Sequence, residues 1–353
     1  MKRLSLYILS FTILISSCEK LQDTEHPENI DPMGYIMFFP GINTKAPIKE
    51  NMKDPNAPFG VLGYNYSKET NWATARVLAT PDVFYNVNVN YSNNIFTYQD
   101  NDTDLKPWSS VDKCSFFAYY PMASSSNNIT ISSSNALDVP IVSYEFPFPA
   151  STSTVMDVPA STAISDLMTA SAIDITSVGS GYVNLNFEHR LFCIDVIVRN
   201  YNSNPVTINN LTLTLTGLKY SKITIPLDKN DTKVDVTTDG TAPSTTTFKI
   251  TNKTVVVPGY TDSKNLSYSI SKNGSDNGGY LFLIPQETRS LTGSVSWDEI
   301  NDFDNVNTTF TSNTALEEGK RYVVVINIAG ESITIAIIEE ESWDSKDVNI
   351  EFN

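Results

Sequence analysis

Residues 183–200 read VNLNFEHRLFCIDVIVRN, and the spacing of apolar residues in this stretch decides the fold class. Apolar side chains stand at odd numbers from Val183 to Phe187 and at even numbers from Ile194 to Val198. A two-residue period is typical of a β-strand with one buried face. The change from odd to even numbers predicts a bulge or tight bend near residues 189–192.

The same alternation recurs along the chain, in short runs separated by Asn, Ser, Thr, Gly and Pro. Further predicted strands are 35–39, 87–91, 211–215, 280–284, 322–328 and 333–337. Helical periodicity is weak, and residues 165–174 are the one segment where it favours a short helix. Many short strands without intervening helices predict an all-β protein built from antiparallel β-sandwiches.

The length of 353 residues predicts two folded domains. A boundary is expected near residues 200–205, where YNSNP separates two apolar runs. The expected domains are therefore an N-terminal β-sandwich over 35–200 and a C-terminal β-sandwich over 201–353.

The first 18 residues, MKRLSLYILSFTILISSC, have the composition of an export signal. A basic start precedes an apolar run that is shorter than the roughly 20 residues a membrane-spanning helix needs. Residues 15–18, ISSC, resemble a bacterial lipobox, so we expect cleavage after residue 17 and lipid on Cys18. Residues 18–34 are polar and acidic and predict a flexible tether.

The composition excludes several classes of function. The formal net charge of −16 argues against nucleic-acid binding. The chain has two histidines, His26 and His189, too few for a histidine-based metal site or nucleophile triad. Past Cys18, only Cys114 and Cys193 remain, and free buried thiols are expected, with a single bridge as the alternative. We therefore expect no cofactor and no enzymatic activity.

Two acidic groups and one histidine are candidate ligand sites. Residues 100–104, DNDTD, have the alternating acids of a calcium loop but lack the central glycine and distal glutamate of an EF-hand. These residues and the acidic run 339–341 are expected to be solvated. His189, on a predicted strand, is expected to hydrogen-bond a neighbour.

A series of motifs follows in order along nearly the whole mature chain. The motifs are IMFFPGINTKA at 36–46, FGVLGYN at 59–65, FFAYYP at 116–121, DLM at 166–168, the stretch 183–200, LFLIPQ at 281–286, EGKRYVVVINI at 318–328 and Trp343. The series resembles the fimbrillin family, the Mfa-like lipoproteins from which Bacteroidales type V pili are assembled, and FFAYYP is its most specific member. Two departures are Arg190, where the family has alanine, and the continuation past Trp343 to NIEFN.

The resemblance implies two tandem transthyretin-like β-sandwiches with Greek-key connections. It also implies assembly by strand exchange, in which a trypsin-like protease removes the first strand and a neighbouring subunit's C-terminal strand replaces it. The removable strand would comprise Tyr35, Ile36, Met37, Phe38 and Phe39. The loop that follows lacks arginine and offers Lys45, Lys49 and Lys53 for cleavage.

Two segments are candidates for the donated strand. The first has the stronger alternation, with Ile333, Ile335 and Ile337. The second lies nearer the end of the sequence, with Val348, Ile350 and Phe352. The implied partners are other pilus subunits, outer-membrane lipid through Cys18, the processing protease and a host or glycan ligand. The implied location is the outer membrane and the fimbrium.

Two alternatives to a polymerising shaft or tip subunit remain open. One is an anchor or accessory subunit that keeps its lipid and its first strand. The other is a surface lipoprotein that binds glycans or nutrients through the aromatic faces of Trp72, Trp108 and Tyr119. Tryptic processing of the chain distinguishes the first alternative, and glycan-array binding that depends on Trp72 or Trp108 would support the second.

Overall fold

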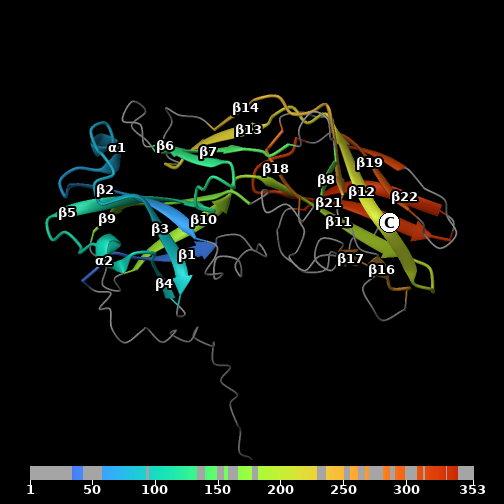
Figure 1. Ribbon diagram of the computed structural model, residues 1–353, viewed down its shortest axis with the longest axis horizontal. Helices are drawn as coiled ribbons and strands as arrows, with labels where there is room; N and C mark the ends of the chain where they lie inside the picture. Colours follow the sequence, from blue (N-terminus) through green and yellow to red (C-terminus); the bar gives the residue numbers. More distant parts are fainter. Residues whose placement is uncertain are drawn as a thin grey trace, which may run out of the picture.

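A computed structural model of the chain describes residues 34–42, 58–92, 95–132, 140–148, 155–157, 166–176, 182–228, 236–249, 255–260, 267–269, 281–286, 291–298, 308–312, 315–330 and 332–340. The fold is nearly all-β (Figure 1). The described residues hold two helices of four residues each, α1 (Trp72–Ala75) and α2 (Asn101–Asp104). Neither described helix is long and apolar enough to cross a bilayer.

A seven-stranded sheet forms one end of the elongated molecule (Figure 1). Its order is β1-β10-β9-β5-β2-β3-β4, and every neighbouring pair is antiparallel except β1 and β10, which are parallel. The strands are β1 (Met37–Ile42), β2 (Phe59–Ser67), β3 (Phe84–Ser92), β4 (Ile95–Tyr98), β5 (Asp112–Tyr120), β9 (Met168–Ile175) and β10 (Tyr182–His189).

The central strands of this sheet are buried on both faces. On β5, Phe116 and Ala118 point into a first core, which also contains Phe38 and Phe187. Phe117 and Tyr119 point to the opposite face, into a second core. The near-continuous apolar motif at 116–121 is explained by this double burial, because every position of β5 from 114 to 120 is buried.

A four-stranded sheet, β14-β13-β7-β6, covers the second face of the seven-stranded sheet. Its strands are β6 (Ile129–Ser132), β7 (Ile141–Glu145), β13 (Lys222–Pro226) and β14 (Thr237–Asp239). Val142, Tyr144 and Ile223 bring this sheet into the second core. Two of its strands precede residue 200 and two follow it, and the division of the chain into two domains near that residue stays a prediction.

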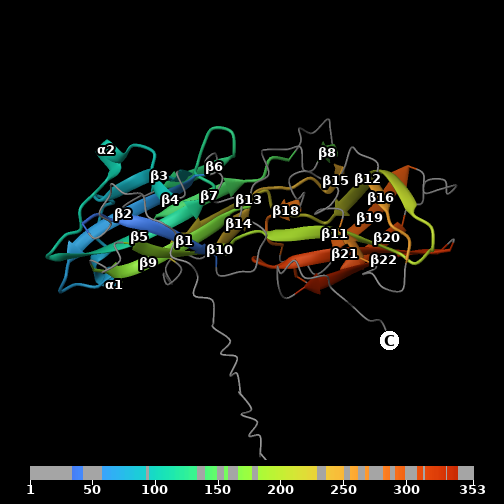
Figure 2. The same cartoon turned by 90° about the horizontal axis from the view of Figure 1, so that it is seen from below.

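Two further sheets form the other end of the molecule (Figure 2). One contains β17-β11-β21-β22 with β18 paired to β11, and the other contains β20-β19-β12-β15-β8 with β16 paired to β12. The strands are β8 (Val155–Asp157), β11 (Phe192–Asn200), β12 (Val206–Thr216), β15 (Thr245–Lys249), β16 (Val255–Val257), β17 (Ser267–Ser269), β18 (Leu281–Leu283), β19 (Leu291–Asp298), β20 (Thr308–Ser312), β21 (Arg321–Ala329) and β22 (Ser332–Glu340). Alternate residues such as Leu213 on β12 and Val324 on β21 fill the second core between them.

The predicted bend at 189–192 is confirmed, and it is the place where the chain passes from one sheet to another. Strand β10 ends at His189 and β11 begins at Phe192 in a different sheet. The two residues between them shift the two-residue period, which is why the apolar positions change from odd to even numbers.

The helix expected at 165–174 is wrong, because residues 168–175 form strand β9. Met168, Ala170 and Ala172 alternate into the first core, and β5 supplies a hydrogen-bonding partner along the strand. Tertiary pairing overrides the weak helical pattern of these small residues. The acidic run 100–104 includes the short helix α2, and the described residues contain no group of three or more side chains able to hold a metal ion.

Cys114 on β5 and Cys193 on β11 are buried thiols, and no disulfide joins them. Burial raises the pKa of the Cys114 thiol to about 12, with the nearby Asp82 and Asp112 carboxylates adding to the effect. The thiolate that reacts and binds metals is therefore scarce at Cys114.

A buried ion pair between neighbouring strands allows a test of the second half of the fold. Arg321 Nη2 of β21 lies 2.5 Å from the Oδ2 atom of Asp195 on β11, and the Asp195 side chain is fully buried. Replacing Arg321 with Met leaves the carboxylate buried without this guanidinium and should lower the free energy of unfolding by about 3–5 kcal/mol. Urea denaturation measures the change.

The double variant Asp195→Leu with Arg321→Met is the matched control. It removes both charges and should recover most of the lost stability, because an apolar pair of similar volume replaces the ions. A double variant as unstable as the single one would show that the two charges do not act as a pair.

Candidate functional site

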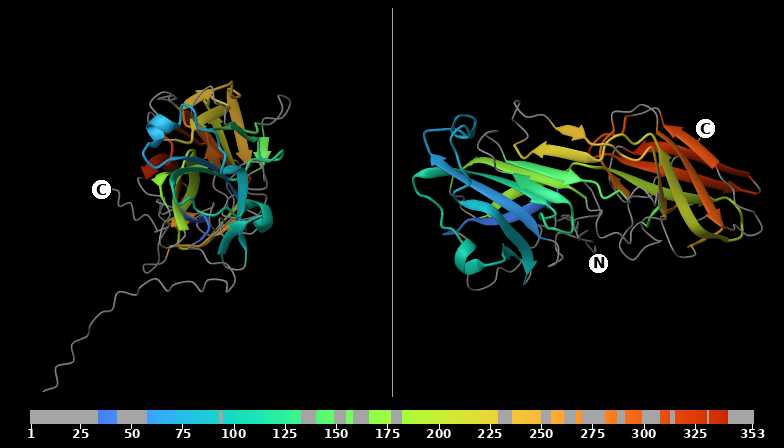
Figure 3. Two further views of the ribbon diagram at one scale, coloured as in Figure 1. Left: turned by 90° about the vertical axis from the view of Figure 1, so that its left-hand side faces the viewer. Right: turned by 45° about the horizontal axis from the view of Figure 1, so that its top comes forward.

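Strand β1 lies at the edge of the seven-stranded sheet and is the candidate functional element. It pairs in parallel with β10 over six residue pairs, from Met37↔Tyr182 to Ile42↔Phe187. Figure 3 shows β1, in blue, at this edge. The strand begins two residues later than predicted, and Tyr35 instead forms an isolated bridge with Pro107.

Phe38 is the main apolar contact of β1. Its side chain is 1% exposed and lies edge-on to three other rings, with centroid distances of 5.7 Å to Phe84, 6.2 Å to Tyr98 and 5.2 Å to Phe116. These rings come from β3, β4 and β5. The neighbouring Ile36 and Met37 are equally buried, whereas Phe39 is 51% exposed. Phe38 therefore connects an edge strand to strands on the opposite side of the curled sheet.

Backbone groups of Ile36 and its neighbour Gly34 hold the start of this segment in place. The Ile36 N–H donates to the Lys106 carbonyl at 2.9 Å, and the Tyr98 hydroxyl donates to the Ile36 carbonyl. The Trp108 N–H donates to the Gly34 carbonyl at 3.2 Å. Burial raises the pKa of Tyr98, so its hydroxyl stays protonated and remains a donor. These bonds use main-chain atoms of the strand, so they do not depend on its side chains.

We use the term β1-binding surface for the edge of β10 together with Phe84, Tyr98, Phe116 and the Lys106 carbonyl. It offers ladder hydrogen bonds along one side and a ring-lined site for one large side chain. This combination matches recognition of an extended strand, in which main-chain bonds give affinity and alternate side-chain sites give specificity.

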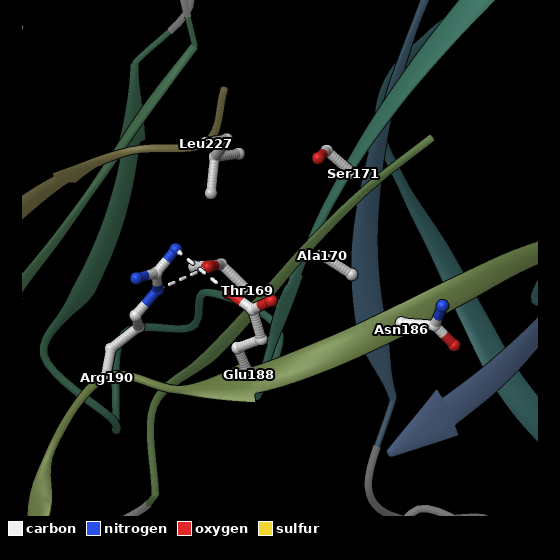
Figure 4. A pocket seen from close by; sticks show the side chains of 7 residues that line it. All are labelled: Thr169, Ala170, Ser171, Asn186, Glu188, Arg190 and Leu227. Carbon is white, nitrogen blue, oxygen red and sulfur yellow. Dashed lines mark hydrogen bonds and ion pairs between the residues drawn. The ribbon is translucent and has the colours of Figure 1, made fainter. Parts of the chain in front are cut away.

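Strand β10 is joined much more closely to β1 than to β9. Its ladder with β9 contains two residue pairs, Glu188↔Thr169 and His189↔Met168, and the strands diverge beyond them (Figure 4). A hollow of about 80 Å³ lies at this fork, which is too small for a drug-sized ligand. It is lined by Thr169, Ala170, Ser171, Asn186, Glu188, Arg190 and Leu227.

Charged groups at the fork hold the junction between the sheets. Arg190 Nε donates to Thr169 Oγ1 at 2.7 Å, and Arg190 Nη1 donates to Glu318 Oε1 at 3.1 Å. Glu188 lies 3.9 Å from the same guanidinium, which is thus balanced by two carboxylates. The arrangement is structural, since the guanidinium already has anionic partners from both ends of the molecule.

His189 and Asp166 form a buried pair beside this cluster, with 2.5 Å between His189 Nδ1 and Asp166 Oδ2. Their side chains are 0% and 3% exposed. Burial raises the pKa of Asp166, and His189 opposes that shift. The expected hydrogen bond from His189 to a neighbour is confirmed. A substrate cannot reach this pair, because both side chains are enclosed.

The aromatic residues considered for glycan binding lie in the cores. Trp72 is 2% exposed, packs on Tyr64 and Phe117, and donates its indole N–H to Asp228 Oδ2 at 2.7 Å. Tyr119 is fully buried, and Trp108 is half-buried against Phe116. The alternative of a glycan platform gains no support at Trp72 and Tyr119, because their faces pack against other side chains.

Several predicted site residues lie outside the described part of the chain: Cys18, Lys45, Lys49, Lys53, Val348, Ile350 and Phe352. Ile333, Ile335 and Ile337 lie on β22, which pairs with β21 over nine residues. Sequence reasoning missed the ring-lined site and the backbone bonds from Tyr98 and Lys106. The motif at 116–121 indicated Phe116, one of the three rings of this site. No local sequence pattern indicated that Phe84 or Tyr98 would join it.

The described residues form a nearly all-β protein of several sheets, with an edge strand whose Phe38 ring lies among three other rings. A sequence model described as fimbrillin-like matches residues 44–343. Since the match covers most of the chain, the protein belongs to the fimbrillin-like family. No curated protein matches the chain.

Solved structures of similar fold include proteins linked to fimbriae and adhesion. A fimbrial protein from Bacteroides vulgatus ATCC 8482 has a TM-score of 0.58 and 19% identity, with 88% of this chain and 99% of that chain covered. A candidate cell adhesion protein from Bacteroides uniformis ATCC 8492 has a TM-score of 0.48 and 14% identity, with 89% and 100% covered. The first likeness supports the overall fold of the chain.

Two adjacent phenylalanines test the importance of the ring-lined site. Phe38→Ala removes a ring enclosed by Phe84, Tyr98 and Phe116 and should lower the free energy of unfolding by about 3–5 kcal/mol. Phe39→Ala, in the same strand with a half-exposed ring, should change it by about 0.5 kcal/mol. Chemical denaturation of the uncleaved protein measures both, and equal losses would contradict the role assigned to Phe38.

Proposed function

We propose that this protein is a structural subunit of a cell-surface pilus, assembled by strand exchange at the β1-binding surface. The observation that carries the proposal is β1 itself, an edge strand whose Phe38 ring fills a site built by three other strands. Membership of the fimbrillin-like family and the fimbrial protein of similar fold support a pilus role. A structural family also favours a role in assembly over catalysis.

The positions of the lysines suit release of β1 by proteolysis. Lys45, Lys49 and Lys53 all lie between the end of β1 at Ile42 and the start of β2 at Phe59. One cut in this interval separates β1 from the rest of the chain, after which non-covalent contacts alone hold the strand. A trypsin-like protease is the proposed processing partner.

Loss of β1 would expose both parts of its binding surface. The edge of β10 would present main-chain donors and acceptors to water, and the rings of Phe84, Tyr98 and Phe116 would lose their cover. Unpaired strand edges bind other strands readily. A strand from a second subunit would restore the ladder and the apolar contact together, and repetition along one direction gives a filament.

The lipid has a place in the same proposal. Acylation of Cys18 would deliver the precursor to the outer membrane, and the lipidated segment would leave with β1 after cleavage. A subunit that is not cleaved would keep both and act as an anchor. In either case the expected location is the cell surface and the fimbrium.

Limited trypsin treatment of the chain lacking residues 1–17 tests the proposal. Cleavage should occur within residues 45–53, and the product should form a ladder of polymers that mass spectrometry and size-exclusion chromatography resolve. The physical reason is that cleavage makes β1 exchangeable for a strand from another copy. Lys346 should be changed to Gln in all preparations, so that trypsin does not remove the last seven residues.

The triple variant Lys45→Gln, Lys49→Gln, Lys53→Gln is the matched control, and it should stay uncut between β1 and β2 and remain monomeric, whether or not trypsin cuts the tether at Lys20. If the unmodified chain is also uncut between β1 and β2 and monomeric, the shaft proposal fails and the anchor role is supported. Cleavage without any polymer would contradict strand exchange between copies of this chain.

A further inference from the structure

Strands β9 and β10 are consecutive and antiparallel, yet they are only partly paired. Residues 168–175 and 182–189 are all described, and the ladder between them consists of Glu188↔Thr169 and His189↔Met168. Beyond these pairs the strands diverge around the hollow of about 80 Å³ (Figure 4). Consecutive antiparallel strands commonly pair along their length, so a contact elsewhere in the sheet holds these two apart.

The register of the two formed pairs can continue without moving any side chain to the other face. It would place residues 170–173 opposite residues 187–184, with Ser171 opposite Asn186. The apolar members of these segments that belong to the first core are Ala170, Ala172, Leu185 and Phe187. The alternation of the two strands therefore already agrees. The side chains of β9 at the hollow are small, so they leave room for β10 to approach.

Strand β1 is the contact that holds β10 away from β9. It pairs with residues 182–187, along the outer edge of β10. It is also fixed to the far side of the curled sheet, because the Ile36 N–H donates to the Lys106 carbonyl at 2.9 Å and the Tyr98 hydroxyl donates to the Ile36 carbonyl. The Phe38 ring adds the contacts of the ring-lined site. Through β1, the outer edge of β10 is tied to the opposite edge of the sheet.

The side chain of Asn186 lies between β1 and the hollow. A Cβ atom on Gly41 of β1 would stand 2.7 Å from Asn186 Oδ1, so the β1 main chain passes directly against this side chain. The same asparagine lines the hollow. The presence of β1 therefore acts on a residue that would pair with β9 if the ladder continued.

The paired end of β9 and β10 is a fixed point about which β10 can turn. Arg190 Nε donates to Thr169 Oγ1 at 2.7 Å, and Arg190 Nη1 donates to Glu318 Oε1 at 3.1 Å. These bonds hold the chain on the far side of the two formed pairs. A small rotation of β10 about this end would close the hollow and leave the junction between the sheets in place.

We propose that β1 is a strap that holds β10 away from β9, and that β10 completes its ladder with β9 when β1 leaves. The inference rests on the proposed function in one respect, since processing is the step that releases β1. In the closed form Leu185 and Phe187 move with β10, and the β1-binding surface loses one wall. A new strand must reopen the ladder, and this cost favours strands that place a large ring where Phe38 lies.

Hydrogen exchange in the uncleaved chain tests the strap without proteolysis. Phe38→Ala loosens β1, and the amides of residues 170–173 that point toward β10 should then exchange about tenfold more slowly, because they gain partners. Simple loss of structure would make them exchange faster, so the sign of the change is decisive. Phe39→Ala is the matched control and should leave them unchanged. Tyr98→Phe, which removes only the bond to the Ile36 carbonyl, should slow the exchange by a smaller factor.

A cross-strand disulfide gives a second measurement. The pair Ser171→Cys with Asn186→Cys should oxidise about tenfold faster when Phe38→Ala is added, because a disulfide needs the two Cα atoms within about 7 Å. Peptide mapping by mass spectrometry identifies the bridge and distinguishes it from any bridge to the buried Cys114 and Cys193. Equal oxidation rates with and without Phe38→Ala would overturn the inference, as would faster exchange of the β9 amides in both Phe38→Ala and Tyr98→Phe.

The matched control for the disulfide is Thr169→Cys with Glu188→Cys. These two residues are already directly paired, so their oxidation rate should not depend on β1. A control pair that also oxidised faster with Phe38→Ala would mean that the whole sheet had loosened, and the strap would be contradicted.

Polymerisation of the cleaved chain separates this inference from the proposed function. The oxidised bridge between positions 171 and 186 should slow polymer growth about tenfold, and a reductant should restore it. Equal polymer growth with and without the bridge would overturn the role of the strap in strand entry and leave strand exchange standing. A bridge that forms as expected in a chain that never polymerises, even when reduced, would support the strap and contradict the pilus proposal.

Discussion

The packing of Phe38 against Phe84, Tyr98 and Phe116 is the contact on which the first half of the structure depends. It joins β1, the last strand at one edge, to β3 and β4 at the other edge, so the sheet curls around its own apolar interior. A sheet closed in this way protects its edges from water and from unwanted pairing. The closure uses a short strand that pairs in parallel with β10, and the residues between β1 and β2 include the three lysines proposed for cleavage.

The central strands have contacts beyond those with β1. Strands β2 and β5 are buried on both faces, with one face in the first core and the other against the four-stranded sheet. The second core continues from that sheet into the far end of the molecule, which includes Leu213 and Val324. Loss of β1 affects the first core, while the contacts that hold the sheets to one another lie in the second.

Much of the fold could be predicted from the sequence, because strand periodicity is local. The run at 183–187 alternates cleanly, those at 194–198 and 322–328 are rich in Val and Ile, and the three became β10, β11 and β21. Strand β9 was missed because Ala170 and Ala172 give no strong apolar period, and only pairing with β5 fixes its conformation. The ring-lined site was missed for a related reason: Phe38, Phe84 and Tyr98 are far apart in sequence, and closure of the sheet brings them together.

The fork between β9 and β10 gives the edge strand an influence beyond its own surface. Strand β10 has six partners in β1 and two in β9, so its order depends mainly on whatever strand lies along its outer edge. Its last residue adjoins Arg190, which is bonded to Glu318 from the other half of the chain. In the proposed filament, mechanical load would pass through this junction, and its stiffness would be coupled, through the eight-residue strand β10, to the strand bound at the neighbouring edge.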